Sequence, residues 1–221
     1  MADDPRTGRT GPRPRKPTPA ERREQRATVE DANEVLEAGA RFLEARPRSV
    51  AEVRRKLTRL GYRSDLVATA VERLAELGYL DDASFARAWV DSRDRARPRG
   101  EHALRRELGQ KGVERTLVDG VLDDRREDAA VASAALDGEA LSPDEAAAER
   151  LLDKKLSAIL READPRKRRQ RAYALLARNG FGPDVCATVS KRVVAGLEAD
   201  AAADDDEDDD ADGQPDALAE I

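Results

Sequence analysis

The sequence predicts an all-α fold made of three tandem three-helix repeats. One observation is that aliphatic residues recur at helical spacing between recognisable helix starts and stops, whereas no run of β-branched residues alternates with polar ones as a strand requires. A second is that a helix–glycine–helix pattern recurs around Gly61, Gly112 and Gly180. We therefore expect stacked helical modules that form an elongated, curved body between disordered N- and C-terminal tails.

The stretch from Arg48 to Asp82 shows this pattern most clearly. Ser49 and Glu52 have the spacing of a capping box, in which each side chain satisfies a free backbone amide at a helix start. The apolar positions that follow on a 3.6-residue period are Val50, Val53, Leu57 and Leu60. Gly61 and Gly78 stand where a helix ends in a left-handed residue. The stretch therefore predicts two amphipathic helices, the first with a basic outer face.

The other elements are expected in the following order. The predicted segments are a disordered basic arm rich in Pro and Arg at 1–30, repeat one at 31–80, repeat two at 81–128, a linker or insertion at 129–142, repeat three at 143–197 and a disordered acidic tail at 198–221. Five prolines among the eight Arg or Lys residues of the arm argue against a helix there. The tail is too polar to bury a core.

The repeat also appears in the aromatic residues and the spacing of the three glycines. Gly61 and Gly112 are 51 residues apart and Gly112 and Gly180 are 68 apart, and the 129–142 segment accounts for the surplus. Phe85 and Trp89, at i and i+4, are expected to fill the seam between repeats one and two, with base stacking as the alternative. Tyr62, Tyr79 and Phe181 are expected to seal the turns from inside the core.

Charge is distributed unevenly along the chain. The whole chain carries −6, and the 12 acidic residues from Glu198 onward have no basic counterpart, so residues 1–197 carry +6. A basic body favours an anionic partner. The candidate partner- or DNA-binding residues are Arg54, Arg55, Lys56, Arg59, Arg93, Arg95, Arg97, Arg99, Arg105, Arg106, Lys111, Arg168, Arg169 and Arg171. The alternative for any of them is a solvated helix face with i, i+4 ion pairs.

No catalytic, cofactor-binding or metal-binding set is visible in the sequence. His102 is the only histidine and is expected to face solvent, and the single Cys186 is expected to be a buried, inert thiol. Cys/His pairs at zinc-ligand spacing and a glycine-rich phosphate loop are both missing from the sequence. We therefore expect a non-enzymatic protein without cofactors. The lone cysteine and the lack of a signal peptide or membrane span favour a cytoplasmic location.

Three segments resemble the RecX family of bacterial recombination regulators. They are ARFLEARPRSVAEVRRKLTRLGY, LAELGYLDDASFARAWVDSR and RPRGEHALRRELGQKGV, and the similarity extends over roughly residues 32–197. The resemblance implies three tandem three-helix repeats that bind the RecA recombinase filament on single-stranded DNA, inhibit filament extension and strand exchange, and catalyse no reaction. It further implies weak, non-specific contact with single-stranded DNA, a role in DNA repair, recombination and the SOS response, and a monomer.

A different class of function stays open from the residues alone. Arg48 to Leu77 could form a helix-turn-helix that reads a specific double-stranded DNA site. Against this alternative, the module recurs three times, and the candidate recognition helix carries no Asn or Gln to read a base.

Overall fold

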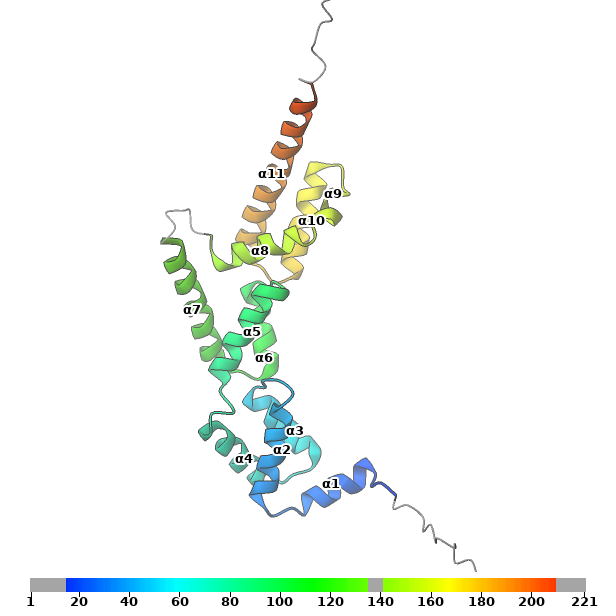
Figure 1. Cartoon of the computed structure of the whole chain (residues 1–221), viewed down its shortest axis with the longest axis vertical. Helices are drawn as coiled ribbons and strands as arrows, with labels where there is room; N and C mark the ends of the chain where they lie inside the picture. The colour runs from blue at the N-terminus through cyan, green and yellow to red at the C-terminus, as the bar shows by residue number, and fades with distance from the viewer. Residues whose placement is uncertain (1–14, 135–140, 210–221) are drawn as a thin grey trace, which may run out of the picture. The chain divides into compact units, whose positions relative to one another are not determined.

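The computed structural model describes residues 15–134 and 141–209, and over these ranges all regular structure is helical (Figure 1). The all-α prediction is therefore confirmed for this part of the chain. The chain divides into two compact units, with the boundary between Asp81 and Asp82.

The first unit holds repeat one and an additional helix. Its elements are α1 (Pro19–Ala27), α2 (Ala32–Leu43), α3 (Val50–Leu60) and α4 (Ser64–Glu76). The apolar faces of α2, α3 and α4 meet in one core, in which Val35, Val53 and Leu57 are completely buried. The predicted capping box is present, since the Ser49 hydroxyl accepts from the Glu52 amide at 3.2 Å and the Glu52 carboxylate accepts from the Ser49 amide at 3.4 Å.

Helix α1 corrects the prediction that residues 1–30 contain no helix. Thr18 and Glu21 form a capping box, and Pro19 occupies the first helical turn, where its missing N–H costs nothing. The prolines of the arm all lie at or before this position, so none interrupts α1. Residues 1–14 of the predicted arm lie outside the described residues.

The second unit holds repeats two and three. Its elements are α5 (Asp82–Ala96), α6 (Glu101–Lys111), α7 (Arg115–Ala134), α8 (Pro143–Asp153), α9 (Leu156–Leu160), α10 (Pro165–Arg178) and α11 (Pro183–Asp209). Helices α5 to α7 enclose one core, around the fully buried Leu104, Leu108 and Leu122. Helices α8 to α11 enclose another, around Leu152 and Leu176. Each repeat therefore has a hydrophobic core of its own.

Three helices of the second unit have other bounds than the sequence pattern predicts. Helix α7 continues to Ala134, into the predicted linker, because the sequence AAVASA favours a helix. Helix α11 continues to Asp209, into the predicted disordered tail, through an alanine-rich stretch without proline. A short extra helix, α9, breaks the helix expected from Ser142 onward near Lys154. Residues 135–140 and 210–221 lie outside the described residues.

The three glycines on which the repeat was aligned all have left-handed backbones. Their φ angles are 106° at Gly61 and 83° at both Gly112 and Gly180, a region that side chains other than glycine rarely adopt. Each glycine directly precedes an apolar residue that is buried, namely Tyr62, Val113 or Phe181. The predicted helix-stop chemistry is confirmed in all three repeats.

One of the predictions about aromatic residues was wrong, that for Tyr79. Phe85 is buried in the core of repeat two, and Trp89 packs against the same core. Tyr79 is 65% exposed and does not seal its turn from inside. Tyr62 and Phe181 are buried as expected.

A buried arginine joins repeats two and three within the second unit. Arg125 of α7 donates to both carboxylate oxygens of Asp94 at 2.9 Å, to Asp144 of α8 at 2.8 Å and to the Pro143 carbonyl at 3.2 Å. Its side chain is only 9% exposed. The other Asp144 oxygen accepts from the Glu101 amide at 3.0 Å. Because Gly100 has no side chain to cap α6, repeat three supplies that cap.

Close backbone contact accompanies this ion-pair network. The Gly100 amide donates to the Asn179 carbonyl at 3.2 Å. A Cβ atom on Gly100 would lie 2.3 Å from the Gly180 carbonyl oxygen and 2.4 Å from the Phe181 backbone. The α5–α6 turn and the α10–α11 turn can approach this closely only because both contain glycine.

We expect Gly100→Ala to lower the free energy of unfolding by about 1–3 kcal/mol, because backbone atoms would have to shift. Gly109 is the matched control, since it lies in α6 with open space around its Cα. Gly109→Ala should stabilise the chain by about 0.5–1 kcal/mol through helix propensity. Urea denaturation followed by circular dichroism measures both, and equal effects would contradict the close packing of the two turns.

Candidate partner-binding surfaces

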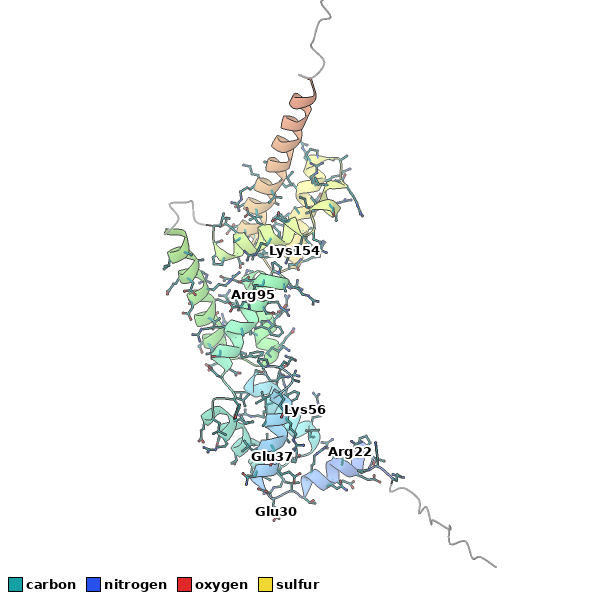
Figure 2. All side chains as sticks on the ribbon, viewed as in Figure 1. Arg22, Glu30, Glu37, Lys56, Arg95 and Lys154 are labelled. Carbon is teal, nitrogen blue, oxygen red and sulfur yellow. The ribbon has the colours of Figure 1, made fainter. Side chains whose placement is uncertain are left out.

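The predicted cationic residues fall into two groups, those already paired within the chain and those still available to a partner. The structure places them on α3, on the C-terminal part of α5 and the turn after it, on α6 and on α10. Figure 2 shows how the side chains are distributed over the helices of both units.

Helix α3 presents its predicted basic face to solvent. Val53 and Leu57 occupy the buried side of the helix, so Arg54, Arg55 and Arg59 are exposed on the other. Lys56 is half-buried, and its ammonium lies 5.5 Å from the centre of the Phe42 ring. Arg54 and Arg59 form no ion pair with any residue that the structure describes. These two guanidinium groups are available to an anionic partner.

Helix α1 extends this surface with arginines that sequence reasoning left in a disordered arm. Arg22, Arg23 and Arg26 line a shallow hollow together with Arg59 of α3. The backbone of Arg23 lies against Gly61, and the Arg26 guanidinium stands 5.9 Å from the Tyr62 ring centre. The Thr18–Glu21 capping box and the proline-free sequence after it were the signals that could have revealed this helix.

Repeat two uses several of its predicted cations for its own structure. Arg93 pairs with Glu107 at 2.6 Å and stacks 4.4 Å from the centre of the Trp89 ring. The Trp89 indole N–H donates to the same carboxylate at 2.9 Å. The Lys111 ammonium lies 4.9 Å from the centre of the Trp89 ring. Arg99 pairs with Glu107 at 3.6 Å and donates to the Asn179 side chain. These residues hold α5, α6 and the α10–α11 turn together.

Arg105 and Arg106 are neighbours in sequence but differ in role. Arg105 donates to Glu101 and to Asp119 at 2.9 Å each. The hydrogen bond to Asp119, helped by that to Glu101, raises the pKa of Arg105, and Arg105 in turn lowers the pKa of Asp119. Burial opposes the charge of Glu101, but hydrogen bonds from Arg126 and Arg105 outweigh it and lower the Glu101 pKa. Arg106 is exposed and has no ion pair among the described residues.

The cations near the α5–α6 turn and on α10 also include both exposed residues and residues that are paired within the chain. Arg95 and Arg97 are exposed, and Lys154 of α8 donates to the backbone carbonyls of Arg95 and Ala96 at 3.3 and 3.2 Å (Figure 2). On α10, Arg168 donates to the Glu162 carbonyl and Arg171 pairs with the Glu162 carboxylate at 3.0 Å. Arg169, between them, is exposed and forms no ion pair within the described part of the chain.

His102 and Cys186 are not placed like catalytic residues in the part of the chain that the structure describes. His102 is exposed on α6, as expected. Cys186 is buried, its thiol approaches the Phe181 carbonyl at 3.6 Å, and burial raises its pKa, which disfavours the reactive thiolate. No group of three or more metal-ligating side chains occurs among the side chains that the structure describes. Within the described part of the chain, none of the helices has the length and hydrophobicity that a membrane span requires.

Comparison with known families accounts for all three repeats. The first, second and third three-helix domains of RecX match residues 36–74, 81–122 and 143–189, respectively. A protein named Regulatory protein RecX from Chlorobium phaeobacteroides (strain BS1) is 32% identical over 151 residues, which cover 68% of this chain and 87% of that protein. Regulatory protein RecX from Thermobifida fusca (strain YX) is 33% identical over 141 residues, covering 64% and 68% of the two chains.

Solved structures show the same fold. The crystal structure of RecX from Lactobacillus salivarius aligns with a TM-score of 0.60 at 17% identity and covers 74% of this chain and 96% of that one. The three matched domains define a regulatory protein built from helical repeats. The chain belongs to the RecX family of regulatory proteins, a non-enzymatic family.

We expect Arg105→Ala to lower the free energy of unfolding by about 1 kcal/mol, because the half-buried Glu101 loses a charged donor. Arg106→Ala, the matched control, should change it by less than about 0.5 kcal/mol. Arg105 depresses the folded-state pKa values of both Glu101 and Asp119. The stability that Arg105 contributes is therefore fully present above the unfolded-state pKa values of these two carboxyl groups, at ~4. It is lost as the pH falls through their folded-state pKa values.

Thermal unfolding of both variants between pH 3 and pH 7 measures this difference. The difference in melting temperature between Arg105→Ala and the parent should be largest at pH 7 and should disappear in acid. A gap that stays constant, or a larger loss for Arg106→Ala, would show that Arg105 is not a structural residue.

Proposed function

We propose that the chain regulates the RecA recombinase by binding the RecA filament on single-stranded DNA and inhibiting filament extension and strand exchange. The observation that carries this proposal is that all three RecX domains are recognised in order along one chain. Relatives named Regulatory protein RecX support it. The location that fits this role is the cytoplasm, where chromosomal DNA is repaired.

The available cations suit such a partner. Arg54 and Arg59 in the first unit and Arg106 and Arg169 in the second are exposed and unpaired among the described residues. A filament repeats its binding surface along its axis, and several weak contacts on one chain then add through their effective concentration. Cations on separate repeats can therefore contribute together, although a single exposed arginine contributes little.

The direct test is the single-stranded-DNA-dependent ATP hydrolysis of RecA, measured while the full chain is titrated in. We expect hydrolysis to fall as the chain is added. Arg54→Glu combined with Arg106→Glu should raise the concentration needed for half-inhibition by at least about tenfold, since two attractive contacts become repulsive.

Arg73→Glu combined with Arg115→Glu is the matched control. It changes the net charge by the same amount, with one exposed residue in each unit, and should leave inhibition near the parent value. Unchanged RecA activity at saturating chain would contradict the proposal. Tight binding to one duplex sequence over random DNA would instead favour a helix-turn-helix regulator.

A further inference from the structure

A groove between α10 and α11 in repeat three combines positive charge with an accessible aromatic ring. The side chains that line it and could contact a ligand are Arg166, Arg169, Gln170, Tyr173 and Lys191. The four residues on α10 are spaced i, i+3, i+4 and i+7, so they form one stripe along that helix. Of these five residues, only Arg169 was among the binding residues predicted from the sequence.

No carboxylate lines this groove beside its cations. Arg166, Arg169 and Lys191 contribute three positive charges, and no carboxylate is among the lining residues. None of the three forms an ion pair with another residue in the described ranges. The neighbouring Arg171 lies outside the groove and pairs with Glu162. Cations that converge without counter-charges form a favourable site for an anion.

Tyr173 adds a second kind of interaction. It is one of the few large apolar side chains in the described residues that are left exposed, with 38% of its surface accessible. The α11 residues beside it are small, namely Ala187 and Ser190, and the Ser190 hydroxyl already donates to the Ala187 carbonyl at 3.3 Å. The aromatic ring, with the Gln170 amide next to it in the groove, is therefore the group that can meet a planar ligand.

We propose that the α10–α11 groove binds a segment of single-stranded nucleic acid. Arg166, Arg169 and Lys191 neutralise successive phosphates, and an unpaired base stacks on Tyr173. A duplex keeps its bases stacked on one another and would leave the tyrosine unused. An acidic peptide would satisfy the cations but not the aromatic ring. The inference extends the proposed function, since it assigns one repeat to the DNA within the filament.

Binding of the full chain to a fluorescently labelled oligothymidylate, measured by anisotropy without RecA, tests this proposal. Tyr173→Ala should weaken binding about 5- to 100-fold, whereas Tyr173→Phe, which keeps the ring, should bind like the parent. Arg169→Gln should weaken binding and reduce the slope of log affinity against log salt by about 0.7. Arg178→Gln, on the same helix outside the groove lining, should leave binding near the parent value.

Each other outcome overturns the proposal. Equal binding of oligothymidylate by Tyr173→Ala and the parent, with unchanged melting temperatures, would remove the stacking role. The same loss against a duplex of equal length would show a general electrostatic surface. Displacement of oligothymidylate by polyglutamate at equal charge concentration, independent of Tyr173, would identify a surface for acidic peptides.

The RecA assay separates this inference from the function on which it rests. If Tyr173→Ala binds oligothymidylate like the parent while the parent still inhibits RecA, the groove assignment is wrong and the proposed function stands. If the parent does not inhibit RecA but Tyr173→Ala loses oligothymidylate binding, the groove stands and the function is wrong.

Discussion

Arg125 makes the interaction on which the second unit depends. A guanidinium that is almost completely buried has to be paired, and Arg125 uses its N–H groups on Asp94 of repeat two and on Asp144 and Pro143 of repeat three. Hydrogen bonds to the two carboxylates outweigh the effect of burial and raise the Arg125 pKa. Burial in turn raises the pKa of Asp144, and the hydrogen bonds from Arg125 and the Glu101 amide oppose this effect. The Asp144 carboxylate that pairs with Arg125 also accepts from the Glu101 amide and so caps the start of α6.

The requirement that a buried cation be paired also separates the remaining cations into structural and available ones. Arg93, Arg99 and Arg105 face carboxylates of their own unit and hold helices together. Arg54, Arg106 and Arg169 are exposed and form no ion pair with any carboxylate that the structure describes. A basic helix face is therefore not one binding surface but a mixture of structural and available charges. Only the second kind can give a partner electrostatic free energy without loss of stability.

Local chemistry made much of this fold predictable. Ser49 and Glu52 lie three residues apart, so their mutual capping is readable from the sequence, and the left-handed Gly61 follows from the same reading. Thr18 and Glu21 carry the same signal, but the prolines before them hid it. Long-range pairing was not predictable, because Arg125 finds Asp94 31 residues away and Asp144 19 residues away. Nothing in the local pattern says which carboxylate an arginine will meet, so Arg105 and Arg106 looked alike.

We propose that unpaired arginines, not paired ones, bind the nucleoprotein partner. This proposal is tested most directly by measuring how salt affects the binding of the full chain to RecA-coated single-stranded DNA. A variant carrying Arg54→Gln, Arg106→Gln and Arg169→Gln should bind more weakly than the parent and with a shallower dependence on salt, at an unchanged melting temperature. The same affinity and the same salt dependence in this variant and the parent would contradict the claim.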